Sequence, residues 1–197
     1  MLVRKAGKCS SRGGLLREDF SLHILDLVEN SINAGATRIE IRVVEDGEND
    51  MLTMEFKDNG SGMNKEMVDK VLDPFVTTRT TRKVGLGLSL FAQAARDCNG
   101  EARIESEPGK GTRLTGNFQL SHIDLKPWGS VVSTLITLIV GNPDIDFFYH
   151  HQKGTFEYTL DTKVIKKELG EVPISNPEVI KLLRKNLKDN LNQIGID

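Results

Sequence analysis

The pattern of apolar and polar residues over positions 21–34 has the period of a helix. The apolar positions form a broad stripe suited to packing on a core: Leu22, Ile24, Leu25, Leu27, Val28 and Ile32. The polar positions, spaced i, i+3, i+7 and i+10, share one face: His23, Asp26, Asn30 and Asn33. We expect Ser21 to cap this helix and Gly35 to end it. The polar face either meets solvent or holds a metal-bound phosphate.

Two strands are expected next, over residues 37–45 and 51–58, because apolar and polar positions alternate in both. In the second strand the apolar positions share a side with Asp58, which therefore points toward the core. A lone buried carboxylate is costly unless a partner pairs with it, so Asp58 is a candidate site residue. Residues 59–62, Asn-Gly-Ser-Gly, allow a tight turn and a close approach of the backbone to a flat ligand.

The next expected elements are two helices and two strands, over residues 65–72, 88–98, 101–106 and 112–120. Asn64 can cap the first of these helices. Gly85-Leu86-Gly87 opens the second helix, and glycines there expose backbone N–H groups that suit a phosphate chain. The order of elements predicts an α+β fold, a two-layer α/β sandwich with a mainly antiparallel sheet and helices on one face.

Residues 121–197 lie beyond this pattern and predict a C-terminal appendage of a helix, a hairpin and further helices. The expected elements are a helix over 128–140, strands over 145–149 and 155–160, a short helix from Asp161 to 169 and a last helix from Asn176 to the end. His150 and His151 fall in the expected hairpin turn, where they either bind a metal or phosphate or do neither. The appendage packs on the sheet, dimerises or contacts a partner.

Length and composition limit the class of protein. The chain has 197 residues, a formal net charge of -2 and a pI near 6.1, which is not a nucleic-acid-binding balance. No apolar run is long enough to span a membrane, and two cysteines make a poor disulfide framework. We therefore expect a reduced cytoplasmic protein without nucleic-acid or membrane partners.

Residues 1–18 are interpreted as a tail, 19–120 as one domain and 121–197 as the appendage.

Four segments together resemble the GHKL ATPase superfamily, which has the Bergerat ATP-binding fold. They are Asp-Leu-Val-Glu-Asn-Ser-Ile-Asn-Ala-Gly-Ala-Thr at 26–37, Asp-Asn-Gly-Ser-Gly-Met at 58–63, Pro-Phe-Val-Thr-Thr at 74–78 with Gly-Leu-Gly-Leu-Ser at 85–89, and Gly-Lys-Gly-Thr at 109–112. The first is most similar to the mismatch-repair branch, and the third to the lid and glycine box of histidine kinases. The resemblance covers residues 19–120 and identifies this part as a histidine-kinase-like ATP-binding domain.

The resemblance implies ATP and Mg²⁺ as cofactors and gives roles to matching positions. Asn30 would be the Mg²⁺ ligand, Asp58 would accept from the adenine amino group, and Thr112 would support that contact. Asp26 would be the catalytic carboxylate beside the phosphates, although hydrolysing members carry the longer glutamate there. The implied nucleotide-binding set is Asn30, Asn33, Asp58, Gly60, Gly62, Met63, Phe75, Thr77, Thr78, Lys83, Gly85, Leu86, Gly87, Leu88 and Thr112.

Two departures from histidine kinases refine the functional hypothesis. Lys83 stands where a glycine is usual, and only some eighteen residues precede the first helix, too few for a hairpin that carries a phospho-accepting histidine. We therefore expect a regulatory Mg-ATP-binding protein that phosphorylates a separate protein or hydrolyses ATP to switch a partner. A serine kinase of the anti-sigma type is one form of this hypothesis. The alternative is a nucleotide-dependent binding module without turnover, and a homodimer is possible in either case.

Overall fold

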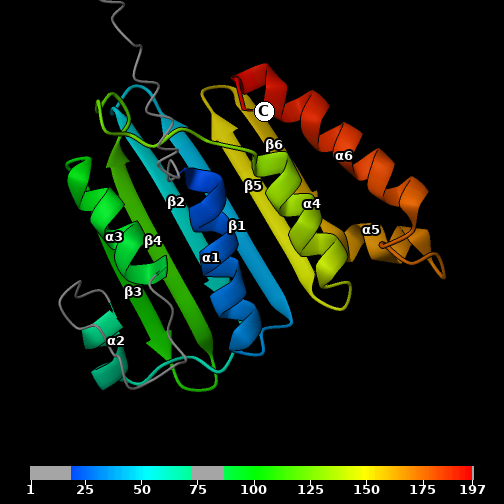
Figure 1. The fold of residues 1–197 in the computed structure, drawn as a ribbon, viewed down its shortest axis with the longest axis horizontal. Coiled ribbons are helices and arrows are strands. Elements are labelled where there is room, and N and C mark those ends of the chain that lie inside the picture. Colours follow the sequence, from blue (N-terminus) through cyan, green and yellow to red (C-terminus); the bar gives the residue numbers. More distant parts are fainter. Residues whose placement is uncertain (1–18, 72–86, 197) are drawn as a thin grey trace, which may run out of the picture.

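The computed structural model describes residues 19–71 and 87–196, which form one six-stranded sheet with helices packed on it (Figure 1). The elements in chain order are α1 (Phe20–Asn33), β1 (Arg38–Asp46), β2 (Met51–Asp58), α2 (Lys65–Val71), α3 (Gly87–Asp97), β3 (Glu101–Glu107), β4 (Gly111–Gln119), α4 (Val131–Gly141), β5 (Asp146–Lys153), β6 (Phe156–Asp161), α5 (Thr162–Leu169), α6 (Pro177–Leu191) and a short 3-10 turn (Asn192–Ile194). No helix among the described residues is long and apolar enough to cross a membrane.

The strand order is β3-β4-β2-β1-β5-β6, and every neighbouring pair is antiparallel except β1 and β5. Helices α1, α3 and α4 lie across one face of the sheet, and α6 packs on α4 at the β6 side (Figure 1). This arrangement confirms the predicted α+β sandwich with a mainly antiparallel sheet. It also confirms the order of helices and strands expected from residues 19 to 120.

The core between sheet and helices follows the predicted alternation. Ile39, Ile41 and Val43 of β1 are buried, and so are the apolar residues of β2 that share a side with Asp58. Aromatic rings then fill the space between α1, α3 and β4, with Phe91 packed edge-on against Phe118. The buried apolar side of β2 therefore ends at Asp58, as its sequence pattern indicates.

The start of α1 differs from the expectation. Asp19, not Ser21, is the N-cap residue: its carboxylate accepts from the Leu22 backbone N–H at 2.9 Å. The Ser21 hydroxyl instead donates to the same carboxylate at 2.6 Å. The expectation was wrong because a carboxylate two residues earlier reaches the free N–H groups first. At the other end Gly35 has φ +75°, as expected for a residue that ends a helix.

The C-terminal region adds two strands to the same sheet. β5 pairs with β1 in parallel, and Arg38 lies opposite Asp146 at the start of the ladder. α4 crosses from β4 to β5 and packs on α1, so it covers the part of the sheet that α1 leaves open. Of the three roles left open for residues 121–197, packing on the sheet is therefore the one that the structure describes. The boundary at residue 120 stays a prediction.

His150 and His151 are not in a turn, because β5 continues through both to Lys153. Their side chains therefore lie on opposite faces of the sheet. His151 is fully buried; its Nδ1 is 2.8 Å from the Tyr149 hydroxyl and its Nε2 is 2.9 Å from Glu45 Oε1. The expected turn was placed too early, since the true turn needs only Gly154 and Thr155.

Glu45 is a buried carboxylate whose ionised form the fold stabilises. Burial by itself raises its pKa, but hydrogen bonds from His151 and Lys153 and the charge of Lys153 outweigh burial, so the pKa lies below its ordinary value. A carboxyl whose pKa is lower in the folded protein stabilises the fold at any pH above its pKa in the unfolded chain, about 4.3. This stabilisation is lost as the pH falls through the pKa of the carboxyl in the folded protein.

Glu45→Gln is therefore expected to lower the free energy of unfolding by about 1–3 kcal/mol near neutral pH. Because the variant lacks the stabilisation that only the ionised carboxylate provides, its free energy of unfolding should approach that of wild type below about pH 4. Urea unfolding of both proteins across this pH range measures the difference. Glu48→Gln, at an exposed carboxylate in the following turn, is the control and should change little. A Glu45→Gln effect that does not depend on pH would contradict this account of the cluster.

Candidate functional site

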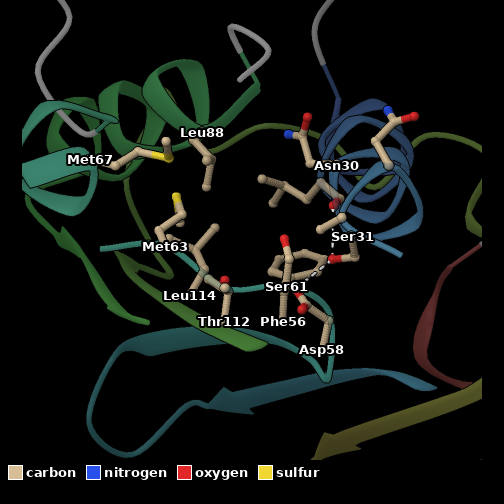
Figure 2. Close-up of a pocket in the computed structure, with 14 residues that line it drawn as sticks. Asn30, Ser31, Phe56, Asp58, Ser61, Met63, Met67, Leu88, Thr112 and Leu114 are labelled. Carbon is tan, nitrogen blue, oxygen red and sulfur yellow. Dashed lines mark hydrogen bonds between the residues drawn. The ribbon is translucent and has the colours of Figure 1, made fainter. Parts of the chain in front are cut away.

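A cavity of about 490 Å³ lies between α1, the ends of β2 and β4, and helices α2 and α3 (Figure 2). Its lining combines apolar side chains with a few polar ones: Leu27, Asn30, Ser31, Asn33, Ala34, Phe56, Asp58, Ser61, Gly62, Met63, Met67, Leu88, Thr112 and Leu114. Asn30 lies on the α1 side, and Asp58 and Thr112 lie on the sheet side (Figure 2). A largely apolar cavity with few convergent polar groups is typical of a small-molecule site.

Asp58 is held at the end of β2 by two hydrogen bonds. Ser31 of α1 donates its hydroxyl to Asp58 Oδ2 at 2.9 Å, and the Gly60 backbone N–H donates to Oδ1 at 2.8 Å. Both bonds fix the orientation of the carboxylate while leaving it lone pairs for a further donor. Asp58 is half-buried, and these contacts are the partners that a carboxylate pointing to the buried side requires.

The loop after Asp58 packs directly against the turn between β3 and β4. A Cβ at Gly62, where φ is +65°, would lie 2.1 Å from the Glu107 carbonyl oxygen, so only glycine fits without a shift. The Gly109 backbone N–H donates to the Ser61 carbonyl at 2.8 Å and ties the two segments together. The glycine at position 62 thus brings the backbone close to one wall of the cavity.

Gly87 opens α3 directly beside α1. A Cβ at Gly87 would lie 2.9 Å from the Asp26 Cβ and 3.6 Å from Asn30 Nδ2. The absence of a side chain therefore lets the positive N-terminal end of α3 approach the carboxylate and carboxamide of α1. This is the side of the cavity where an anionic group would meet backbone N–H groups and polar side chains together.

The structure brings together part of the predicted site. Seven predicted residues line the cavity: Asn30, Asn33, Asp58, Gly62, Met63, Leu88 and Thr112. Gly60 lies beside the cavity through its bond to Asp58, and Asp26 and Gly87 adjoin its α1 side. Six predicted residues lie outside the described residues: Phe75, Thr77, Thr78, Lys83, Gly85 and Leu86.

Sequence reasoning missed seven lining residues, Leu27, Ser31, Ala34, Phe56, Ser61, Met67 and Leu114. The periodicity of the helix and that of the strands could have predicted most of them. Positions 27, 31 and 34 share the helix face next to Asn30, and Phe56 and Leu114 lie two residues from Asp58 and Thr112 on their strands. His23, which the spacing placed on the polar face of α1, does not line the cavity: it is buried and packs edge-on against the ring of Phe91, with centroids 5.8 Å apart.

The sandwich and its cavity, lined by a strand-end carboxylate and by carboxamides of α1, are consistent with the class of histidine-kinase-like ATPase domains. The chain belongs to the family described as Histidine kinase-, DNA gyrase B-, and HSP90-like ATPase (HATPase_c), whose model matches residues 17–124. This finding confirms the resemblance inferred from the four sequence segments.

Curated relatives match about half of the chain. A putative sensor protein of Shewanella frigidimarina is 35% identical over 103 residues, 51% of this chain and 16% of the relative. Sensor protein kinase FleS of Pseudomonas aeruginosa is 36% identical over 111 residues, 55% of this chain and 27% of the relative. This chain thus corresponds to less than a third of either protein. The solved ATPase domain of Aquifex aeolicus MutL complexed with ADP aligns over 84% of this chain and 86% of that one, with TM-score 0.46 and 18% identity.

Proposed function

We propose that this chain binds Mg-ATP in the cavity and passes the γ-phosphate to a separate protein or to water as a regulatory switch. The observation that carries the proposal is the orientation of Asp58, a fixed carboxylate on the sheet side of a cavity of about 490 Å³ whose α1 side carries Asn30 and Asn33. Membership of the ATPase family supports ATP as the ligand.

The two walls suit the two ends of a nucleotide. Phe56, Met63 and Leu114 provide apolar surface for a flat base, and Asp58 beside them accepts from an amino group on that base. The opening of α3 at Gly87, next to Asn30, suits the phosphate chain because the helix end is positive and the carboxamide is a neutral donor and acceptor. The base and the phosphates would therefore lie at different ends of one cavity.

The residues at the phosphate end also fit a magnesium ion. Magnesium prefers oxygen ligands and is commonly held by one or two protein oxygens together with substrate phosphates. Asn30 offers a carboxamide oxygen on the cavity wall, and the described residues hold no group of three or more acidic, histidine or cysteine side chains that would form a site without nucleotide. When bound, the ion would neutralise phosphate charge; Asn30 would hold it.

Asp26 is the candidate catalytic residue for hydrolysis. Its side chain adjoins the start of α3 and is exposed, so a water molecule can reach it. In this role the carboxylate would orient the water and accept its proton as the water oxygen attacks the γ-phosphorus. The bond from that phosphorus to the bridging oxygen would break, and ADP would leave. Transfer to a protein acceptor needs the same position to orient a side chain of the partner instead, and the sensor-kinase relatives support this second form.

The fate of the γ-phosphate tests these roles. Asp26→Asn is expected to lower phosphate release from Mg-ATP about 100-fold or more, since removing a general base typically costs that much, with little change in ATP affinity. Glu29→Gln is the matched control: it removes a neighbouring exposed carboxylate of α1 that does not line the cavity. Equal losses in the two variants would contradict the role of Asp26. Bound ATP without release by wild type would leave two options, transfer to a partner protein or a nucleotide-dependent binding module without turnover.

A further inference from the structure

The hydroxyl of Ser106, a half-buried residue of β3, makes three close polar contacts behind the cavity wall. The Met63 backbone N–H donates to Ser106 Oγ at 2.8 Å. Ser106 Oγ also lies 3.0 Å from the Gly111 carbonyl oxygen and 2.8 Å from Thr112 Oγ1. Met63 and Thr112 both line the cavity, whereas Ser106 does not, so it contacts two wall residues from behind.

Only one assignment of donors and acceptors makes all three contacts hydrogen bonds. A serine hydroxyl has one proton to donate and two lone pairs that accept. A carbonyl oxygen only accepts, so the Ser106 proton must point to the Gly111 oxygen. The two lone pairs of Ser106 then accept from the Met63 N–H and from the Thr112 hydroxyl. The Thr112 proton is therefore directed away from the cavity, toward Ser106.

The direction of this proton decides what Thr112 offers a ligand. With its own proton donated to Ser106, Thr112 Oγ1 presents only lone pairs to the cavity. Thr112 lies opposite Asp58 in the ladder between β2 and β4, and Asp58 also presents lone pairs. Two neighbouring acceptors favour a ligand edge that carries a donor and oppose one that carries an acceptor.

We infer that Ser106 is a positioning residue that turns Thr112 into an acceptor and so selects purines with a 6-amino group over those with a 6-oxo group. The inference rests on the proposed binding of ATP. Ser106 does not line the cavity, and its effect on the choice of purine is exerted through Thr112; its bond from the Met63 N–H holds the backbone of the loop. The bond from the Gly109 N–H to the Ser61 carbonyl does not involve Ser106, so we expect it to hold the wall in place when the serine hydroxyl is removed.

The test compares the binding of ATP and ITP, which differ in the group at position 6 of the purine. Calorimetry on the full chain with Mg²⁺ measures both dissociation constants for wild type, Ser106→Ala and Ser106→Thr. Ser106→Ala frees the Thr112 hydroxyl to rotate and donate to a 6-oxo group. The preference for ATP over ITP is expected to fall about tenfold, the effect of one hydrogen bond, and Ser106→Thr should restore it because the hydroxyl is kept.

A double-mutant cycle separates this role from a structural one. In a Thr112→Val background Ser106→Ala should leave the ATP-to-ITP ratio unchanged, because no hydroxyl remains to be directed. Equal losses for ATP and ITP in Ser106→Ala would show loosened packing and would overturn the inference. The same ratio change with and without Thr112→Val would also overturn it. If wild type binds neither nucleotide, the proposed function fails as well; if wild type prefers ATP and Ser106→Ala leaves that preference intact, only the inference fails.

Discussion

Asp58→Asn is expected to lower the affinity for ATP about 100-fold while leaving the protein folded, since a hydrogen bond to a charged group contributes about 1.5–3 kcal/mol. The carboxylate accepts from the Gly60 N–H through Oδ1 and from the Ser31 hydroxyl through Oδ2. An asparagine that keeps its oxygen toward Gly60 places its NH₂ group toward Ser31, whose hydroxyl can turn to accept. The fold therefore tolerates the change.

ATP binding in the cavity, in contrast, should be weakened by Asp58→Asn. The same NH₂ group would replace an acceptor at the wall with a donor, and an adenine amino group would then meet a donor. Calorimetric titration with ATP and thermal unfolding of the free protein measure binding and folding separately. A variant that melts like wild type and binds ATP like wild type would show that the adenine end of the cavity has been misplaced.

Asp50→Asn is the matched control for this substitution. Asp50 lies just before β2, at the opposite end of the strand from Asp58, and its carboxylate accepts from Ser121 and Gln119. The substitution removes the same formal charge far from the cavity. It should leave ATP affinity unchanged, so any loss common to both variants reflects net charge and not the site.

Gly62→Ala is expected to destabilise the protein by at least about 3 kcal/mol, the second large effect. Alanine at φ +65° costs about 1–2 kcal/mol by itself. The added Cβ would also lie 2.1 Å from the Glu107 carbonyl oxygen, a backbone atom that cannot turn away. The loop must therefore separate from the β3–β4 turn, which adds to the cost. Urea unfolding measures the change, and ATP affinity should fall with it because Gly62 lines the cavity.

Gly109→Ala separates the strain of the backbone from the clash. Gly109 has φ +78° in the turn that faces Gly62, but a Cβ there would have nothing within 4 Å. Its substitution should cost only the conformational part, about 1–2 kcal/mol. Similar losses of unfolding free energy in the two variants would mean that the loop moves away from the β3–β4 turn at no energetic cost. The close packing at Gly62 would then not be what stabilises this wall.

Much of the site could be predicted because its residues follow local periods. The alternation of β2 places Asp58 on the buried side, and the helical spacing of α1 places Asn30 and Asn33 on the cavity side, within a few residues of chain. Four short segments in order were enough to predict the family, which the family model confirms. The placement of Asp58, Asn30 and Asn33 depends on the backbone geometry of one strand and one helix, so it needs no knowledge of distant neighbours, whereas the family was predicted from resemblance.

The partners of these residues could not be predicted in the same way. The Ser31 hydroxyl reaches Asp58 across 27 positions, and His151 reaches Glu45 across 106. Asp19 caps α1 instead of the expected Ser21. Both residue types are good N-caps, so residue preferences alone do not decide which of two nearby side chains binds the free N–H groups.

The sequence by itself determined the sandwich and the elements of residues 19–120, because periodicity and turn chemistry act locally. It also predicted seven of the residues that line the cavity, in part through the family resemblance. The tertiary structure alone decided that β5 joins β1 in parallel, that His151 is buried, and that Ser106 stands behind Thr112. These outcomes depend on which strands become neighbours and in which register. That choice is made by packing over the whole sheet, where one residue of slip would turn every side chain to the other face.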